Sequence, residues 1–267
     1  MDTIKFMKIT KIYKRSIAFF SDTHVGSLYA LWPEGFGWEL SPIQKALLSY
    51  WAKARLILDE NQVDTVFHLG DVIHGTNRNA YGKLLVTPDL NQQVRAASFL
   101  LRQIKGKRDF YLIEGTRYHS SLDYETAEAV ADSVGGKYLG CYANVKLKGT
   151  NRTLNLAHGE GGASFYPASV LDREGVFIKV SESLKKIPKI DLIVRGHKHK
   201  FIHLHQQELH ILQLPCWMAM EPSKIYLKSY GRLQPDIGFV VVLIDDKDRF
   251  TVFHYLFPLP FSEADYV

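Results

Sequence analysis

A short apolar stretch that ends in metal-binding side chains constrains this chain more than any other feature. The residues Ile17-Ala18-Phe19-Phe20 form a continuous apolar run, and Ser21-Asp22-Thr23-His24 follows it directly. A run of this kind is typical of a strand that is buried on both faces of a sheet. In open α/β sheets, ligands bind beyond the carboxyl ends of the strands. The sequence therefore predicts a functional site at the tip of this strand.

The same arrangement recurs three times further along the chain. Leu69-Gly70-Asp71, Leu156-Ala157-His158-Gly159 and Gly196-His197-Lys198-His199 each follow a strand-like run. A single aspartate or histidine at a strand tip is more often a cap or a satisfied polar residue than a ligand, but four such tips together indicate one assembled site. The candidate metal ligands are Asp22, His24, Asp71, His158, His197 and His199.

The ligand types indicate which chemistry such a site performs. First-row divalent metals accept imidazole and carboxylate ligands, and two carboxylates with four imidazoles are too many for one ion but suit two. Asp71, which comes from a neighbouring strand, could bridge two metals about 3.5–4 Å apart. A metal pair lowers the pKa of a bound water and stabilises the attacking and leaving oxygens of a phosphoryl transfer. We expect two divalent ions, manganese first, with iron, zinc or nickel as alternatives.

Strand and helix signals alternate in the first half of the chain, and strands dominate the second half. Ser41-Pro42 predicts a helix start, and helical spacing continues to Leu58. The other predicted helices cover 90–104, 123–134 and 168–186, and the predicted strands are 63–69, 109–113, 141–147, 153–157, 190–194, 201–205, 209–214, 238–244 and 250–257. This order predicts an α/β fold of two packed mixed β-sheets flanked by helices. We expect a single domain over residues 1–267, in which the C-terminal strands, about 201–257, complete the second sheet.

Residues 25–40 form a predicted insertion loop that is rich in aromatic residues and glycine and has no helical or strand period. Long irregular loops in compact domains are often functional, so one interpretation is a lid or a partner surface. The other interpretation is that Trp32, Phe36 and Trp38 fold back and cap the core. The loop could also close a dimer, because the sequence does not fix the oligomeric state.

Composition limits the class of protein and its partners. No apolar run approaches the roughly 18–20 residues of a membrane span, so we expect no membrane partner. Two cysteines, Cys141 and Cys216, are too few for a disulfide framework and suit a reducing compartment, which predicts a cytoplasmic location. The net charge of +5 is compatible with a nucleic-acid partner, because Lys and Arg displace counterions from phosphate, but the basic residues are scattered.

The strand-tip motifs resemble those of the calcineurin-like metallophosphoesterases. Asp22-x-His24, Gly70-Asp71, His158-Gly159 and Gly196-His197-x-His199 occur in the family's order and at its usual separations, between about Ile17 and His199. The resemblance implies a four-layer αββα sandwich with a binuclear metal site. It also implies that one metal is bound by Asp22, His24 and His199, that the other is bound by His158 and His197, and that Asp71 bridges the two.

The third motif departs from the family pattern and is similar to variants in short phage-type and bacterial members. The family has Gly-Asn-His-Asp or Gly-Asn-His-Glu after the third strand, whereas this chain reads Gly115-Thr116-Arg117-Tyr118-His119. Three arrangements could compensate: Thr116 or water replaces the asparagine, His119 becomes a ligand, or the second metal binds weakly. We expect His119 to bind phosphate or protonate the leaving group. Arg117 could bind phosphate as a bidentate donor or form a surface ion pair, and His74 could contact the substrate.

The resemblance implies hydrolysis of a phosphoester by attack of metal-bound hydroxide, and it leaves the substrate open. The basic charge, Arg117 and the aromatic loop favour a phosphodiester in nucleic acid, whose bases could stack on exposed aromatic rings. The alternative is a phosphomonoesterase or a small-molecule or nucleotide phosphodiesterase. A degenerate member that binds metal or a partner without turnover is a further hypothesis, which the six retained ligand-type side chains disfavour.

Overall fold

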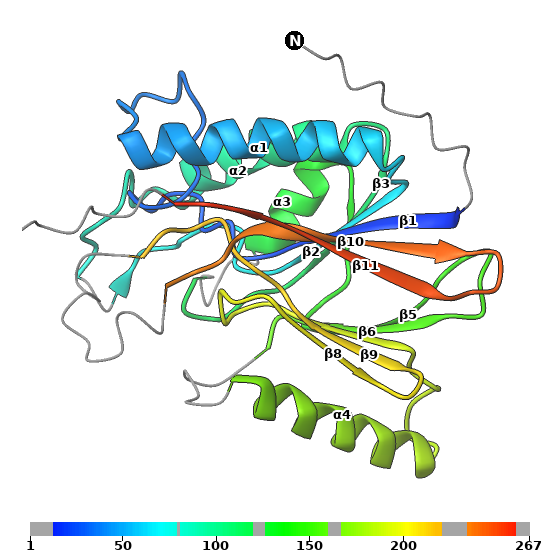
Figure 1. The fold of residues 1–267 in the computed structure, drawn as a ribbon. Helices are drawn as coiled ribbons and strands as arrows, with labels where there is room; N and C mark the ends of the chain where they lie inside the picture. The colour runs from blue at the N-terminus through cyan, green and yellow to red at the C-terminus, as the bar shows by residue number, and fades with distance from the viewer. Residues whose placement is uncertain (1–12, 79–80, 120–125, 160–166, 221–233, 260–267) are drawn as a thin grey trace, which may run out of the picture.

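Two β-sheets pack face to face and helices cover their outer surfaces (Figure 1). The structure is a computed structural model and describes residues 13–78, 81–119, 126–159, 167–220 and 234–259. Its helices are α1 (Pro42–Glu60), α2 (Leu90–Lys105), α3 (Thr126–Val134) and α4 (Pro167–Ser183). The first three helices lie over one sheet, and α4 lies over the other (Figure 1). The predicted α/β fold of two mixed sheets flanked by helices is confirmed.

The first sheet has six strands and is mixed. Its strands are β1 (Tyr13–Phe20), β2 (Thr65–Leu69), β3 (Asp109–Ile113), β4 (Lys137–Tyr138), β10 (Ile237–Asp245) and β11 (Phe250–Phe257). Their order is β11-β10-β1-β2-β3-β4, with β1 to β4 parallel and β10 antiparallel to both β1 and β11. The two-residue strand β4 is too short to leave a pattern in the sequence, and it was not predicted.

The second sheet has five strands and is also mixed. Its strands are β5 (Tyr142–Lys146), β6 (Thr153–Ala157), β7 (Leu192–Arg195), β8 (Ile202–Gln206) and β9 (Leu209–Gln213), in the order β5-β6-β7-β9-β8. Strands β6, β7 and β9 are parallel, and the outer strands β5 and β8 pair antiparallel with their neighbours.

The apolar run in β1 is continuous because both of its faces are buried. Ile17 and Phe19 belong to the core between the two sheets, whereas Ala18 and Phe20 face the helices α1 to α3. Successive side chains of a strand point to opposite faces, so a central strand between two cores needs apolar residues at every position. This position leaves the polar residues after Phe20 at the end of the sheet.

The prediction that residues 201–257 complete the second sheet is wrong for their C-terminal half. Strands β8 and β9 join the second sheet, but β10 pairs with β1 in the first sheet and carries β11 with it. The physical reason is burial, since Val240 and Val242 face the core between the sheets while Phe239 and Val241 face the helix side. A strand that is apolar on both faces fits beside the central strand β1.

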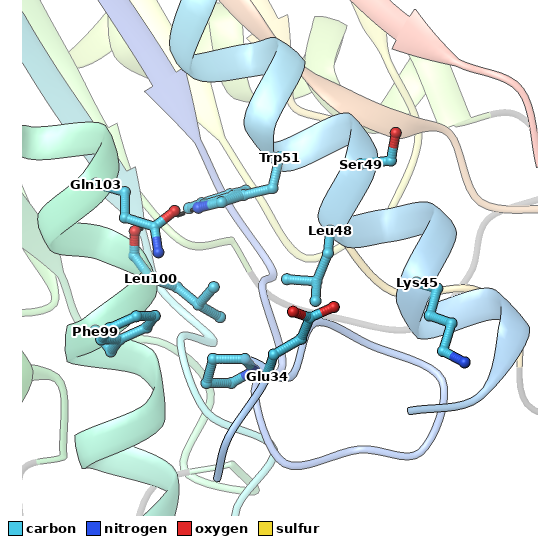
Figure 2. A pocket seen from close by; sticks show the side chains of 9 residues that line it. Glu34, Lys45, Leu48, Ser49, Trp51, Phe99, Leu100 and Gln103 are labelled. Atoms are coloured by element: carbon cyan, nitrogen blue, oxygen red, sulfur yellow. Dashed lines mark hydrogen bonds between the residues drawn. The ribbon is translucent and has the colours of Figure 1, made fainter. Parts of the chain in front are cut away.

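The aromatic loop is divided between core and surface. Trp32 is fully buried, its ring contacts Phe36 edge to face at 6.3 Å, and Phe36 in turn contacts Phe99. Capping of the core is therefore the correct interpretation for Trp32, whereas Trp38 is 42% exposed. Pro33 and Glu34 of the same loop line a hollow of about 480 Å³ between α1 and α2 (Figure 2). Within the described ranges, no helix combines the length and apolarity that a membrane span requires.

Candidate metal centre

The four strand-tip motifs meet beyond the carboxyl ends of β1, β2, β6 and β7. Strands β1 and β2 are neighbours in the first sheet, and β6 and β7 are neighbours in the second, so each sheet contributes two tips. The predicted ligands fall into two groups whose ligand atoms lie within 4.8 Å of one another. One group is Asp22, His24 and His199, and the other is Asp71, His158 and His197.

The backbone is strained at most of these positions. Positive φ angles occur at five of the six residues, namely Asp22 (54°), His24 (43°), Asp71 (48°), His197 (76°) and His199 (54°). This region is sparsely populated by residues other than glycine, and each such residue costs on the order of 1–3 kcal/mol. Because β1 ends at Phe20, the turn that follows can direct both Asp22 and His24 toward one centre. Strain of this kind clusters at functional sites.

Each oxygen of the Asp22 carboxylate has its own surroundings. Oδ2 accepts a hydrogen bond from the backbone N–H of His197 at 2.8 Å and lies 2.5 Å from the Ser21 hydroxyl oxygen. Oδ1 instead faces imidazole nitrogens, with Nε2 of His199 at 3.2 Å and Nε2 of His24 at 3.6 Å. The carboxylate is fully buried, and the contacts of Oδ2 with His197 and Ser21 fix its orientation. Oδ1 is therefore the oxygen that faces the imidazoles of the group.

The Asp71 carboxylate is held in a similar way by the altered third motif. Its Oδ1 accepts hydrogen bonds from the backbone N–H of Thr116 at 2.7 Å and from the Thr116 hydroxyl at 3.0 Å. Its Oδ2 faces Nε2 of His158 at 3.0 Å and Nε2 of His119 at 3.9 Å. The Thr116 hydroxyl thus lies against Asp71.

Two glycines allow the backbone to approach these carboxylates. A Cβ atom on Gly196 would lie 2.0 Å from the Ser21 hydroxyl oxygen and 2.9 Å from Oδ2 of Asp22. A Cβ atom on Gly115 would lie 2.2 Å from Oδ1 of Asp71. All three distances are below van der Waals contact, so a larger residue would displace Ser21 or the carboxylates.

The electrostatics favour positive charge at the centre of the site. Burial lowers the pKa of His158, but the Asp71 and Asp22 carboxylates outweigh it and raise that pKa to about 9. Burial also lowers the pKa of His199, but Cys216 and Asp22 outweigh it and hold that pKa well above its ordinary value. Although burial would raise the pKa of Asp71, His158 and His119 hold it below its usual range. Two ionised carboxylates in a buried site need cations beside them.

The donor set fits divalent metal ions. The Nδ1–H of His158 donates to the carbonyl oxygen of Leu69 at 2.5 Å, which leaves Nε2 as the nitrogen toward Asp71. Metal-binding histidines commonly donate their second ring N–H to a carbonyl in this way. With the inward oxygens of Asp22 and Asp71, the site offers the carboxylate and imidazole ligands that manganese, iron, zinc and nickel accept.

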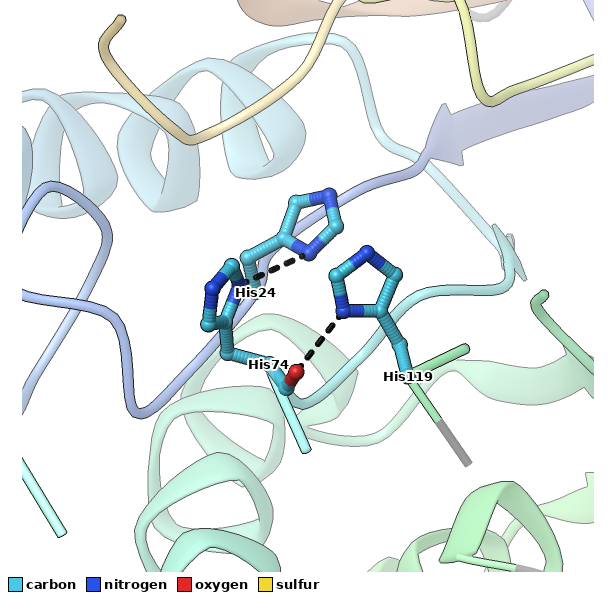
Figure 3. A group of neighbouring side chains, drawn as sticks. All are labelled: His24, His74 and His119. Atoms are coloured by element: carbon cyan, nitrogen blue, oxygen red, sulfur yellow. Dashed lines mark hydrogen bonds between the residues drawn. The ribbon is translucent and has the colours of Figure 1, made fainter. Parts of the chain in front are cut away.

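A third group of histidines adjoins the first group (Figure 3). His24, His74 and His119 each offer a ring nitrogen within 4.8 Å of the others. His74, predicted as a substrate contact, is only 3% exposed, and its Nδ1 lies 3.4 Å from Nδ1 of His24. The Nδ1–H of His119 donates to the backbone carbonyl of His74 at 2.7 Å. His119 is grouped with His24 and His74, and not with His158 and His197.

The remaining sequence-predicted residue, Arg117, is exposed. It forms no ion pair with any residue in the described ranges, so the surface ion pair that the sequence left open is not found there. Its proposed contact with phosphate stays a prediction.

Several contacts at the site were not anticipated from the sequence. Ser21 was part of the first motif but was given no role, and its hydroxyl contacts Asp22. Cys216 was interpreted only as a small buried residue, and it lies beside His199. His68 is fully buried and its Nε2 lies 3.1 Å from the Thr23 hydroxyl oxygen, behind the first motif. The available signals were the positions of Ser21 next to Asp22 and of His68 three residues before Asp71, whereas Cys216 is brought in by the fold.

A family profile described as calcineurin-like phosphoesterase matches residues 15–201. A search of curated proteins finds no match. Similar solved structures include an archaeal phosphodiesterase, with 14% identity, a TM-score of 0.48, and coverage of 90% of this chain and 99% of that one. Wild-type Vps29 from Entamoeba histolytica in complex with zinc has 14% identity, a TM-score of 0.47, and coverage of 90% and 92%. A predicted phosphoesterase from Streptococcus pneumoniae has 13% identity, a TM-score of 0.40, and coverage of 91% and 93%.

Proposed function

Because the chain belongs to the calcineurin-like phosphoesterase family, we propose that it hydrolyses a phosphodiester with the help of two divalent metal ions. The observation that carries this proposal is the convergence of two carboxylates and four imidazoles from four strand tips. Five of these six residues keep a strained backbone, which supports a role beyond stability.

The two groups of ligand atoms support a division of the residues between two ions. The first ion would be held by Asp22, His24 and His199, the second by His158 and His197, and Asp71 would bridge them. Thr116 contacts Oδ1 of Asp71 through its amide and its hydroxyl, and the hydroxyl also lies 3.2 Å from Oδ2, so Oδ2 is the less occupied of the two oxygens. We favour manganese, with iron, zinc or nickel as alternatives. When bound, such a pair activates a water molecule and offsets the charge that develops on the phosphoryl oxygens.

Thr116 orients Asp71 in this proposal instead of binding metal. Its amide donates to Oδ1 of Asp71, and its hydroxyl lies within hydrogen-bond distance of Oδ1 at 3.0 Å and of Oδ2 at 3.2 Å. The position that the family's asparagine would fill on the second ion is then left to water or to a phosphoryl oxygen of the substrate. His119 is the candidate acid or phosphate ligand, because its Nδ1–H is held by the His74 carbonyl and its Nε2 lies toward Asp71. Burial lowers the pKa of His119.

Support for the substrate class comes from charge more than from aromatic stacking. Trp32 is buried and cannot stack on a base, so Trp38 is the exposed tryptophan of the loop. Arg117 is an exposed cation two residues before His119, where a phosphate group of a diester could reach it. We therefore keep nucleic acid as the favoured diester, with a nucleotide or small-molecule diester as the alternative.

The test is hydrolysis of bis(p-nitrophenyl) phosphate and p-nitrophenyl phosphate in the presence of manganese. Wild-type protein should cleave the diester faster, and Asp71→Asn should lose this activity. Asp246→Asn, which changes an exposed carboxylate in the turn between β10 and β11, is the matched control and should retain it. Preference for the monoester would replace the diesterase proposal with a phosphatase. Absence of both activities, with less than one metal bound per chain, would support the degenerate alternative.

A further inference from the structure

His74 is fixed against the segment that carries His24. Beyond the ends of β1 and β2, the backbone N–H of His24 donates to the carbonyl of Asp71 at 3.0 Å, and that of His74 donates to the carbonyl of Val25 at 2.9 Å. These hydrogen bonds continue the pairing of the two strands into the site. The side chain of His74 is 3% exposed, so its orientation is set by its neighbours and not by solvent.

The ring of His24 has two differently placed nitrogens. Its Nε2 lies 3.1 Å from Nε2 of His199 and 3.6 Å from Oδ1 of Asp22, whereas its Nδ1 lies 3.4 Å from Nδ1 of His74 (Figure 3). If Nε2 is the metal ligand, the proton of the neutral ring must be on Nδ1. That Nδ1–H then points at a nitrogen of His74, which accepts it.

The second contact of His74 is through its backbone. A carbonyl oxygen only accepts, so the 2.7 Å contact with Nδ1 of His119 places the proton of a neutral His119 on Nδ1. Its Nε2 is then the nitrogen with the free lone pair, 3.9 Å from Oδ2 of Asp71. One residue thus fixes the tautomers of two histidines, one through its ring and one through its main chain.

We propose that His74 is a positioning residue that orients His24 as an Nε2 metal ligand and directs Nε2 of His119 toward Asp71. The inference rests on the proposed binuclear site. Partners that accept the second ring N–H of a metal-binding histidine fix its orientation and increase its basicity, and their removal typically lowers metal affinity about 10–100-fold. His74 therefore acts on metal affinity through its ring, and on the orientation of His119 through a carbonyl that no side-chain substitution removes.

The competing arrangement is a third metal ion held by the three imidazoles. Their ligand atoms are close enough to one another to surround an ion. However, an ion on Nδ1 of His24 together with another on Nε2 would require this ring to lose both of its protons. The neutral ring serves as a ligand with one nitrogen and as a donor with the other, which favours the positioning role.

The experiment compares manganese affinity and metal content in wild type, His74→Leu and His74→Asn. Leucine fills the space without an acceptor, whereas the side-chain oxygen of asparagine can replace Nδ1. We expect two ions per chain in all three proteins, about 10–100-fold weaker binding of one ion in His74→Leu, and affinity within about threefold of wild type in His74→Asn. His254→Leu, outside the site, is the control and should bind as wild type does.

Three results would overturn the inference. One is equal affinity in wild type and His74→Leu, and another is three ions in wild type that fall to two in His74→Leu, which would make His74 a ligand. The third comes from ¹⁵N chemical shifts of the zinc-loaded wild type, which need no variant to fold: a proton on Nε2 of His24 or of neutral His119 contradicts the proposed orientation. Fewer than two ions in the wild type would instead refute the binuclear site itself, so the two failures are distinguishable.

Discussion

The backbone N–H of His197 donates to Oδ2 of Asp22 at 2.8 Å, which joins the last motif of the chain to the first. Asp22 follows β1 in the first sheet, and His197 follows β7 in the second. The hydrogen bond therefore couples the relative position of the two sheets to the orientation of one carboxylate. Oδ1 of Asp22 is left facing the imidazoles as a consequence.

Replacement of Ser21 by alanine should weaken metal binding. The Ser21 hydroxyl lies 2.5 Å from Oδ2 of Asp22, and its loss frees the carboxylate to rotate. We expect about tenfold weaker manganese binding or more, measured by isothermal titration calorimetry. Ser49→Ala on the exposed face of α1 is the matched control. Unchanged affinity in Ser21→Ala would show that His197 alone holds the carboxylate.

The hydroxyl of Thr116 should matter more than its methyl group. Thr116→Val removes the 3.0 Å hydrogen bond to Asp71 but keeps the backbone one, whereas Thr116→Ser keeps both. We expect manganese affinity and diester hydrolysis to fall about tenfold in Thr116→Val and to stay near wild type in Thr116→Ser. Equal losses in the two variants would point to packing of the methyl group instead.

Gly196→Ala should destabilise the protein, and Ser21→Ala should partly relieve that effect. The new Cβ would lie 2.0 Å from the Ser21 hydroxyl oxygen, which is the closest of its contacts. Because neighbouring substitutions are not additive, Gly196→Ala should lower the midpoint of thermal unfolding less in the Ser21→Ala background than in wild type. The measurement is the midpoint of thermal unfolding, without metal, of wild type, the two single variants and the double variant. A midpoint change in the double variant equal to the sum of the two single changes would contradict the predicted clash.

His68 should make the metal-free protein less stable in acid. Burial lowers the pKa of His68 to about 3, whereas an unfolded histidine titrates near 6.5. Between these values the unfolded chain binds the additional proton, so the stability is present above about pH 6.5 and falls as the pH falls toward 3. His68→Gln should reduce the slope of unfolding free energy against pH by up to about 1.4 kcal/mol per unit. Urea unfolding between pH 7 and 4 tests this, and an unchanged slope would contradict it.

Removal of metal should lower thermal stability. Ions that bind the folded chain stabilise it by mass action, by about 2.7 kcal/mol for each site when the free ion is at 100 times its Kd. A chelator should therefore lower the midpoint of thermal unfolding, and excess manganese should restore it. Asp71→Asn should respond less than wild type, whereas Asp246→Asn should respond fully. If neither chelator nor manganese changes the midpoint of thermal unfolding of the wild type, the protein does not bind the ions.

The sequence by itself determined the elements and the chemistry available at their ends. Ser41 caps α1 because its side chain and that of Gln44 each accept a backbone N–H, which is a contact between residues three positions apart. Burial of β1 and the polar residues after Phe20 were equally visible, since both depend on local patterning. The six ligand-type side chains followed from the ends of these elements.

Only the tertiary structure decided which residues support that site. The placement of β10 beside β1 depends on pairing between segments more than 200 residues apart, and no local pattern distinguishes it from a strand of the second sheet. The contacts of Asp71 with Thr116, of His24 with His74 and of His199 with Cys216 likewise join separate segments. Hydrogen bonds require distances near 3 Å and defined angles, and these are set by how the two sheets pack. The sequence therefore predicted the types of residue at the site, whereas only the fold determined which residues contact them.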